Sequence, residues 1–331
     1  MSRELSFLAL DRPARAEALA TAALAAGKAP QVLEKDLWVC WCLERLFTAT
    51  DIPALVFKGG TSLSKVFRAI DRFSEDVDIT VAGSDLGFED RTDISNAARD
   101  KSLEALNGKL LELARGRLRR ILEDPAVEVA VDDDATIWVR YDSAGQGAGA
   151  GAEYFRDSVK IELGARNPVT PAEPHEITAD LSTALPQMVF PKVTVQVLSP
   201  VRTFWEKATI LHAEYHRAIA KPTAERLARH YYDLSELAEH EIGQRALREM
   251  SLLETVAADK ARLFRRKWAR YDLARPGTLR LIPPDARSVA LAEDLAKMIE
   301  SGMFVGTPPT WAAVLDRLTR LEAAINSAEP D

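Results

Sequence analysis

Two aspartates separated by one residue, Asp76 and Asp78, are the side chains whose spacing most directly indicates chemistry. They alternate with Val77 and Ile79, and this period of two is typical of a β-strand, so both carboxylates lie on one face. Two carboxylates this close repel each other unless a cation lies between them. Their oxygen atoms suit Mg²⁺, which usually takes one or two carboxylates together with substrate phosphates.

A glycine turn precedes this pair. The apolar run Leu55–Phe57 predicts a short strand that Gly59 and Gly60 end, and Thr61 and Ser62 could cap the helix that follows. The N-terminus of a helix favours a phosphate because its backbone N–H groups and its dipole favour negative charge. Metal-binding carboxylates beside a phosphate-binding turn are what nucleotidyl or phosphoryl transfer requires.

A third acidic residue lies on a later predicted strand, Ser158–Leu163. Its alternation places Lys160 and Glu162 on one face. If this strand lies beside the strand of Asp76 and Asp78, Glu162 is the natural third carboxylate of a metal site. The alternative is an ion pair between Lys160 and Glu162 on an edge strand.

Length and composition indicate a globular protein with one large domain or two ordinary ones. The 331 residues are 47% hydrophobic and 28% charged. The formal net charge of -7 argues against generic binding to nucleic acid but leaves room for a local basic patch. We find no apolar run of membrane-spanning length and no signal-peptide pattern, which predicts a cytoplasmic protein without a membrane partner. Cys40 and Cys42 point to different sides of a predicted helix, so neither a disulfide nor a zinc site is expected.

The elements around these residues divide the chain into three segments. We expect N-terminal helices packed on the core over residues 1–50, an α/β catalytic domain over 51–200 and a helical domain over 201–331. The predicted helices are Ala14–Ala26, Pro30–Phe47, Ser102–Glu123, Thr203–Arg217, Ala224–His240, Leu253–Tyr271 and Pro309–Asn326; the further predicted strands are Val127–Val131, Ile137–Tyr141 and Lys192–Leu198. Within the second helix, the charged run Glu34–Asp36 favours a solvated face over a functional role.

Two other clusters have competing interpretations. Basic residues surround Trp268 and Tyr271, which fits RNA backbone contact with base stacking or, alternatively, a solvated helix with aromatic core residues. His212 and His216 have the i, i+4 spacing of a zinc site. However, HAEYH lacks a glutamate directly after its first histidine, which favours two histidines on a helix surface.

The stretch GGTSLSK…RFSEDVD resembles the AbiEii/AbiGii toxin family, the toxin halves of bacterial toxin–antitoxin and phage-defence pairs, to which the mycobacterial MenT toxins are related. VKIEL, LSPVRTFWEKATILH and RHYYDL are similar to further motifs of this family, in the same order. The resemblance implies the nucleotidyltransferase fold, a mixed α/β (α+β) sheet with flanking helices and a C-terminal helical domain. It also implies a type IV toxin that uses Mg²⁺ and an NTP, an antitoxin encoded upstream, and tRNA 3′ ends as acceptor, so that translation is blocked.

The resemblance also implies residue roles. Asp76, Asp78 and Glu162 would hold Mg²⁺; with Lys207 and Asp233 they make up the catalytic set. Lys207 would neutralise nucleotide charge, and Asp233 would position that lysine or the acceptor. The implied nucleotide-binding residues are Gly59, Gly60, Thr61, Ser62, Lys65, Ser74 and Lys207.

Three of the implied positions carry a qualification. Ser74 matches a position where some relatives carry a modifiable serine. Lys65 is a phosphate candidate that could instead face solvent. His230 departs from the family, since many members have a charged residue at this position.

Two alternatives to a tRNA-modifying toxin stay open at this stage. One is a nucleotidyltransferase that modifies a protein or a small molecule. The other is an NTP-binding module without turnover, which would act through a partner. The intact set of Asp76, Asp78, Glu162 and Lys207 favours an enzyme, since a binding module could lose its carboxylates without penalty.

Overall fold

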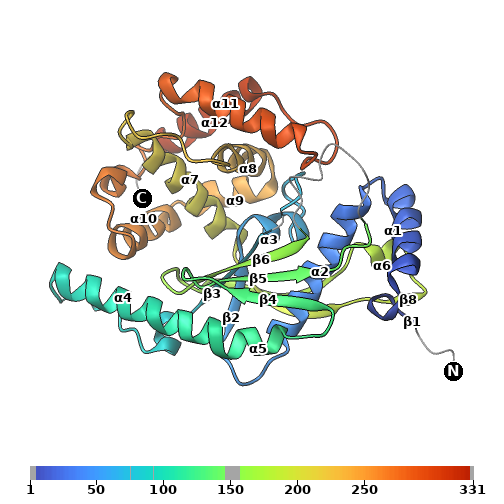
Figure 1. Cartoon of the computed structure of the whole chain (residues 1–331). Helices are drawn as coiled ribbons and strands as arrows, with labels where there is room; N and C mark the ends of the chain where they lie inside the picture. Colours follow the sequence, from blue (N-terminus) through green and yellow to red (C-terminus); the bar gives the residue numbers. More distant parts are fainter. Residues whose placement is uncertain (1–4, 75, 92, 146–156, 329–331) are drawn as a thin grey trace. The chain divides into compact units, whose positions relative to one another are not determined.

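The computed structural model describes residues 5–74, 76–91, 93–145 and 157–328. The chain divides into two compact units (Figure 1). Unit 1 comprises Met1–Val66 and Phe73–Val197, and unit 2 comprises Phe67–Arg72 and Leu198–Asp331. Unit 1 therefore joins the N-terminal helices to the sheet, whereas the short segment Phe67–Arg72 belongs to the helical unit.

Within the described residues, seven strands of the chain form one mixed sheet in the order β4-β5-β6-β3-β2-β9-β7 (Figure 1). Their bounds are β2 Leu55–Lys58, β3 Asp76–Val81, β4 Val127–Val131, β5 Thr136–Tyr141, β6 Ser158–Gly164, β7 Ala172–Thr178 and β9 Lys192–Leu198. Strand β3 runs parallel to β6 and antiparallel to β2, and β2 runs parallel to β9. The sheet is thus mixed, and the strand of Asp76 and Asp78 lies inside it.

The strands predicted from the alternation are confirmed, but β7 was not predicted. Its sequence AEPHEIT contains a proline and charged residues, which lower the strand signal. The sheet tolerates these residues because β7 lies at its edge, where one side of the backbone has no ladder to complete. A second, parallel pair joins β1 (Leu5–Ser6) to β8 (Met188–Val189), both too short to predict.

Helix α2 (Pro30–Phe47) is buried on most of its circumference, as its many apolar residues predicted. Trp38 stacks on Tyr141 of β5 with ring centroids 5.0 Å apart. Leu33 and Leu37 pack in a separate core with α1 (Arg12–Ala26) and α6 (Leu181–Ala184). Helix α2 therefore contacts β5 on one side and α1 and α6 on another, and Cys40 and Cys42 within it are free and buried.

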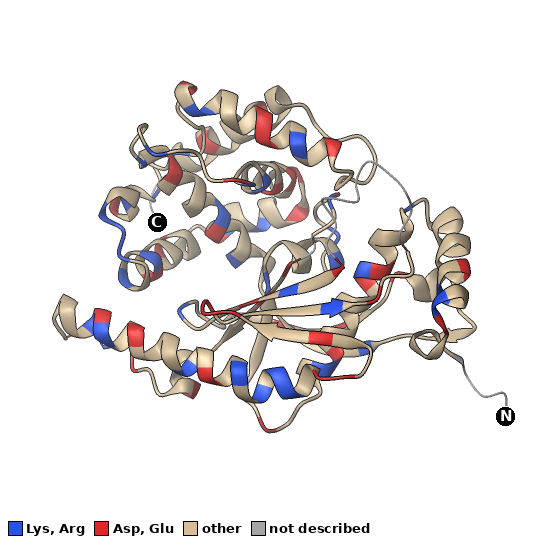
Figure 2. Ribbon diagram, in the orientation of Figure 1, with Lys and Arg blue, Asp and Glu red and all other residues tan. Residues whose placement is uncertain are grey.

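The predicted helix Ser102–Glu123 begins earlier, because Ser95 caps the N-terminus of α4 (Asn96–Leu113) by accepting a hydrogen bond from Ala98. A π-helical turn, Ala114–Leu118, connects α4 to α5 (Arg119–Leu122). Four arginines lie in these last turns, Arg115, Arg117, Arg119 and Arg120. Figure 2 shows Lys and Arg in blue.

Unit 2 is helical. Its helices are α7 Pro200–His216, α8 Ala228–Glu239, α9 Glu241–Arg248, α10 Ser251–Leu263, α11 Asp285–Glu300 and α12 Trp311–Asn326. The core between them is rich in aromatic side chains, among which Phe204, Trp205 and Tyr231 are almost completely buried. No helix among the described residues is both long and apolar enough to cross a membrane.

The prediction of one helix from Leu253 to Tyr271 is wrong. Helix α10 ends at Leu263, and two short 3₁₀ turns, Lys267–Ala269 and Tyr271–Leu273, follow it. Arg265 and Arg270 both have positive φ angles, which a continuous helix does not allow. The basic residues after α10 therefore do not share a helical face.

His212 is fully buried, so its predicted place on a helix surface is wrong. Its Nδ1 accepts a hydrogen bond from the amide of Arg280 at 3.1 Å, and its Nε2 lies 2.9 Å from the carbonyl oxygen of Arg270. A neutral ring satisfies both contacts, with the proton on Nε2. Burial lowers the pKa of His212 to about 4, which is consistent with this neutral form.

Candidate functional site

The strands β3 and β6 lie side by side and in parallel, which was the condition for Glu162 to join the two aspartates. In their register Asp78 is opposite Glu162, and Asp76 is opposite Lys160. Lys160 and Glu162 also form an ion pair along β6. The ion pair of the second interpretation is therefore present, but β6 lies between β5 and β3 and not at an edge of the sheet. Glu162 also neighbours Asp78, and its role as a metal ligand stays a prediction.

Gly59 lies against the carboxylate of Asp78. The two residues are close because Lys58, which precedes Gly59, pairs with Asp78 between β2 and β3. The φ angle of Gly59 is +80°, a conformation that L side chains rarely adopt. A Cβ atom at this position would also collide with the carboxyl group of Asp78. Only glycine thus permits the close approach between the turn and the acidic strand.

The hydroxyl groups of Thr61 and Ser62 do not cap the helix, so this prediction is wrong. Helix α3 (Gly59–Lys65) begins two residues before Thr61 and has Lys58 at its N-cap, without a side-chain cap. The Thr61 hydroxyl donates to the carbonyl oxygens of Asp76 and, at 3.2 Å, Ser74. The Ser62 hydroxyl donates to the Gly59 carbonyl at 2.9 Å. Both side chains are buried and hold the turn and the start of β3 in place.

The donors at this place fit a hard divalent cation. The register of β3 and β6 places Asp76, Asp78 and Glu162 on one face of two adjacent strands, and carboxylates are ligands that Mg²⁺ prefers. Among the described side chains, no three or more His, Cys, Asp or Glu residues converge as a ready-made metal cage. Mg²⁺ does not need such a cage, since substrate phosphates and water complete its coordination. The donor set therefore suits a metal that arrives with a polyphosphate.

A second cluster lies within unit 2, around the fully buried carboxylate of Asp233. Lys207 Nζ lies 2.7 Å from Asp233 Oδ2. Arg72 binds the same carboxylate through two hydrogen bonds, Nε to Oδ1 at 2.6 Å and Nη2 to Oδ2 at 2.8 Å. The predicted contact between Asp233 and Lys207 is present, and one carboxylate holds two cations.

The electrostatics of this cluster follow from burial and from its cations. Burial lowers the pKa of Lys207, and the positive charges of Arg72 and Arg229 lower it further, although Asp233 opposes the shift. Despite burial, the two cations bound to Asp233 hold its pKa below the usual value. Burial and the nearby Lys207 and Arg229 lower the pKa of His230 well below its usual value. His230 therefore adds no charge at neutral pH.

A model of the family described as "Nucleotidyl transferase AbiEii toxin, Type IV TA system" matches residues 41–317 of this chain. The chain belongs to the AbiEii nucleotidyltransferase toxin family. Membership makes it a nucleotidyltransferase with an NTP substrate, and it implies a cognate antitoxin.

Two solved structures are similar to this AbiEii-family chain. MenT4, a nucleotidyltransferase toxin from Mycobacterium tuberculosis H37Rv, is 20% identical with a TM-score of 0.54, covering 97% of this chain and 91% of MenT4. A protein of H. pylori described as a nucleotidyltransferase is 16% identical with a TM-score of 0.36, covering 88% of this chain and 97% of that protein. The likeness to MenT4 supports the nucleotidyltransferase fold. A comparison with curated proteins finds none that matches.

Lys65 does not face solvent, so that alternative is wrong, whereas its role as a phosphate ligand stays a prediction. Its ammonium is buried and lies 2.5 Å from Asp36 Oδ1 and 2.8 Å from Asp180 Oδ1. Asp180 Oδ2 also pairs with Lys28 at 2.5 Å. Although burial works against its charge, the carboxylates raise the pKa of Lys65 above the usual value. Lys65 is thus a buried structural cation at the end of α3.

The predicted solvated face at Glu34–Asp36 is wrong for the same reason. Asp36 is the partner of Lys65, and its Oδ2 also accepts a hydrogen bond from the amide of Asp180 at 2.7 Å. Glu34 is 1% exposed and accepts hydrogen bonds from the amides of Ala144 and Gly145. These charges are buried because partners from distant parts of the sequence compensate them.

Sequence reasoning missed two residues, Arg72 in the cluster around Asp233 and Asp180 in the cluster around Lys65. Arg72 stands in the matched motif RFSEDVD, so the motif itself could have indicated it. Asp180 lies in a proline-rich region and carries no local signal of its role. Each forms an ion pair with a residue that is distant in the sequence. Arg72 is 161 residues from Asp233, and Asp180 is 115 residues from Lys65.

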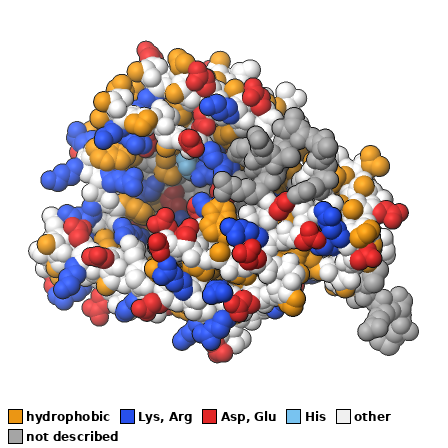
Figure 3. Space-filling model, in the orientation of Figure 1, with side chains coloured by type: hydrophobic (Ala, Val, Ile, Leu, Met, Phe, Trp, Pro, Cys, Tyr) orange, Lys and Arg blue, Asp and Glu red, His pale blue; other side chains and the backbone are white. Residues whose placement is uncertain are grey.

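The basic residues around Trp268 form a cluster of a different kind from the one predicted. The guanidinium groups of Arg217 and Arg266 each lie 5.8 Å from the Trp268 ring. Arg217 directly follows α7 as its C-cap residue and Arg266 lies in the segment after α10, so the two do not come from one helix. On the face of the molecule in Figure 3, Lys and Arg side chains are interspersed with Asp and Glu. Contact with RNA at this cluster stays a prediction.

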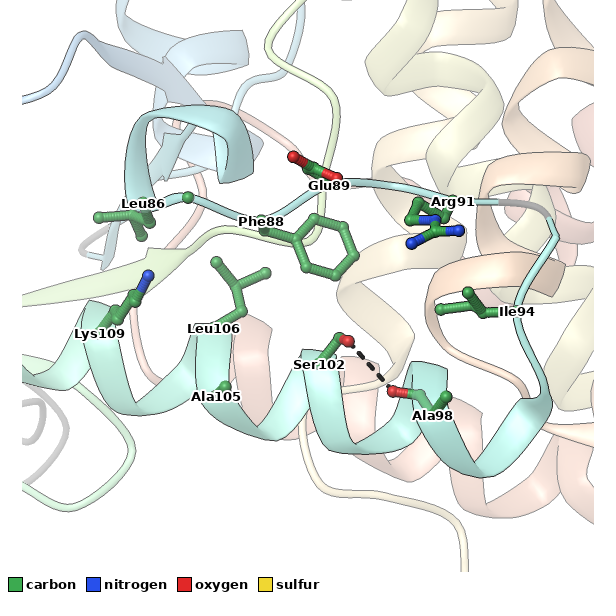
Figure 4. A pocket seen from close by; sticks show the side chains of 11 residues that line it. Leu86, Phe88, Glu89, Arg91, Ile94, Ala98, Ser102, Ala105, Leu106 and Lys109 are labelled. Carbon is green, nitrogen blue, oxygen red and sulfur yellow. Dashed lines mark hydrogen bonds between the residues drawn. The ribbon is translucent and has the colours of Figure 1, made fainter.

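A pocket of about 300 Å³ lies elsewhere in unit 1, between α4 and the segment that follows β3 (Figure 4). Phe88 and Leu106 line it from its two sides, with Lys109 and Arg91 at its ends. None of the predicted site residues lines this pocket, so it is separate from the acidic strands.

Proposed function

We propose that this AbiEii-family chain is an Mg²⁺-dependent toxin that transfers NMP from an NTP to the 3′ end of tRNA and thereby blocks translation. The observation that best supports this is the register of β3 and β6, which sets Asp78 beside Glu162 while Gly59 lies against Asp78. Acidic strands next to a glycine turn provide the groups that in-line nucleotidyl transfer requires.

We assign three Mg²⁺ ligands, Asp76, Asp78 and Glu162. Glu162 also pairs with Lys160. When bound, the metal neutralises the triphosphate and orients its α-phosphorus. The oxygen of the acceptor hydroxyl bonds to that phosphorus as the bond to pyrophosphate breaks. Asp76 or Asp78 accepts the hydroxyl proton.

The turn and the lysine have distinct roles in this proposal. Gly59 and Gly60 bring main-chain N–H groups to the phosphate oxygens, while Thr61 keeps the turn joined to the start of β3. Lys207 neutralises nucleotide charge, and Asp233 orients its ammonium through the 2.7 Å contact. We keep Ser74 among the proposed nucleotide-binding residues because it lies two residues before Asp76 in the chain.

A transfer assay tests the proposal. The purified protein is incubated with Mg²⁺, total tRNA and each α-labelled NTP in turn, with and without EDTA. We expect label on tRNA with the wild type, and a decrease of at least about 10³-fold for Asp76→Asn or Asp78→Asn. Asp85→Asn is the matched control, because Asp85 is an exposed carboxylate shortly after β3.

The acceptor and the consequence are tested separately. Periodate-treated tRNA, which lacks the intact 3′ diol, should take up no label, and tRNA modified by the wild type should not support translation in vitro. Label on a protein or a small molecule in place of tRNA would support the first alternative function. NTP binding without any transfer would support the non-catalytic module instead.

A further inference from the structure

The segment that connects the glycine turn to the acidic strand belongs to the helical unit. Helix α3 ends at Lys65 and β3 begins at Asp76, both within unit 1. Between them, Phe67–Arg72 is part of unit 2. The two elements that carry the proposed phosphate turn and metal ligands are therefore joined through a piece of the other unit.

Arg72 anchors this segment within unit 2. Its side chain is 3% exposed, and its two hydrogen bonds engage both oxygens of the fully buried Asp233. The backbone adds a β-bridge between Arg72 and Phe304 and a 2.9 Å hydrogen bond from the Val305 amide to the Asp71 carbonyl. The planar guanidinium holds a carboxylate in one orientation, which an ammonium does not.

Thr61 holds the other end of the same stretch. Its hydroxyl donates to the main-chain oxygens of Ser74 and Asp76, two and four residues after Arg72. Thr61 thus binds the start of β3, while Arg72, which directly precedes Phe73 in the sequence, is anchored within unit 2. Asp233 is the shared partner, because it also holds Lys207.

We propose that Arg72 is a positioning residue, which through its pair with Asp233 fixes the backbone that carries Ser74 and Asp76. Asp233, which also binds Lys207, then limits the motion of the segment that leads into β3. The inference rests on the proposed function for its effect on catalysis, since a displacement of about 1 Å in a reacting group can decrease the rate about 10²-fold.

Hydrogen–deuterium exchange tests the anchoring without any assumption about activity. In Arg72→Met, the amides of Phe73, Ser74 and Asp76 should exchange at least about tenfold faster than in the wild type, because the segment loses its buried anchor. Arg202→Met is the matched control. Arg202 is about as buried as Arg72, lies in the same unit and on the same helix as Lys207, and pairs at 2.6 Å with Asp259, which is partly exposed. The control should leave exchange at these amides unchanged.

Kinetics then separate positioning from general stability. At saturating NTP, Arg72→Met should decrease kcat about 10²-fold with less than about a threefold change in Kd for the NTP, whereas Arg202→Met should keep kcat within about threefold. Arg72→Lys should recover part of the lost activity, since it keeps the charge but not the planar fork. If Arg72→Met does not fold, the exchange measurement is made on Arg72→Lys, which should show an intermediate increase.

Unchanged exchange at the start of β3 in the Arg72 variants would overturn the inference, whatever the protein transfers. An equal loss of kcat in Arg72→Met and Arg202→Met would also overturn it, because both would then act through stability. Faster exchange together with absence of transfer in the wild type would leave the anchoring intact and refute only the proposed function.

Discussion

Two buried lysines, Lys65 in unit 1 and Lys207 in unit 2, have pKa values that their surroundings shift in opposite directions. Both are at least nine-tenths buried and both bind a carboxylate at 2.5–2.7 Å. Lys65 meets two carboxylates, those of Asp36 and Asp180, and its pKa is raised. Lys207 shares the carboxylate of Asp233 with Arg72, and its pKa is lowered.

The ratio of carboxylates to cations explains this difference. Around Lys65, negative charge compensates the ammonium, so an incoming phosphate would meet repulsion from the two carboxylates. Around Lys207, the positive charges of Arg72 and Arg229 repel the ammonium, so an incoming anion would be stabilised. The comparison assigns a structural role to Lys65 and leaves Lys207 as the candidate for nucleotide contact.

Lys207→Met gives the largest expected effect on activity. We expect kcat/KM to decrease at least about 10³-fold, which corresponds to about 4 kcal/mol of transition-state stabilisation. The melting temperature should change by only a few degrees, because Asp233 keeps its two hydrogen bonds from Arg72. Steady-state kinetics and thermal unfolding measure the two quantities. Lys221→Met, at an exposed lysine of the same unit, is the control, and an equal loss there would contradict the assignment.

Lys65→Met should show the reverse pattern. Removal of the ammonium leaves Asp36 buried without its cation, so the free energy of unfolding should decrease by about 3–5 kcal/mol. Below the melting temperature, kcat of the folded protein should stay within about fivefold of the wild type. Denaturant unfolding tests this beside Lys192→Met, which removes the exposed ion pair with Glu176 and should have little effect. A stable but inactive Lys65→Met protein would restore the phosphate-ligand interpretation.

His212 extends the comparison to a buried group of unit 2 that avoids charge altogether. Its folded pKa of about 4 lies below the unfolded value, so its contribution to stability is complete above about pH 6.5 and is lost as the pH falls towards 4. The loss is at most about 3.5 kcal/mol, since the pKa differs by about 2.5 units and each unit corresponds to about 1.4 kcal/mol. Between pH 4 and 6.5, the free energy of unfolding should therefore depend less steeply on pH in His212→Gln than in the wild type. Denaturant unfolding at several pH values measures this dependence. The same dependence of the free energy of unfolding on pH in both proteins would contradict this prediction.

Local patterns predicted most of the strands and the acidic site. The alternation around Asp76, Asp78 and Glu162 depends only on the two-residue period of a strand, and β3 and β6 followed it. The ends of elements were less predictable. Helix α10 stops at Leu263 although the amphipathic pattern continues, because the chain takes up positive φ angles at Arg265 and Arg270.

The family and the acidic strands were determined by the sequence alone, because motifs and strand periodicity are local properties of the chain. The need for glycine at position 59 became evident only from its φ angle and from the approach of Asp78. Only the tertiary structure decided which charges are buried and with what partners. Lys65 and Asp180 are 115 residues apart, and Arg72 and Asp233 are 161 apart. A charge can be buried only where a partner arrives to compensate its desolvation, and folding alone brings such partners together.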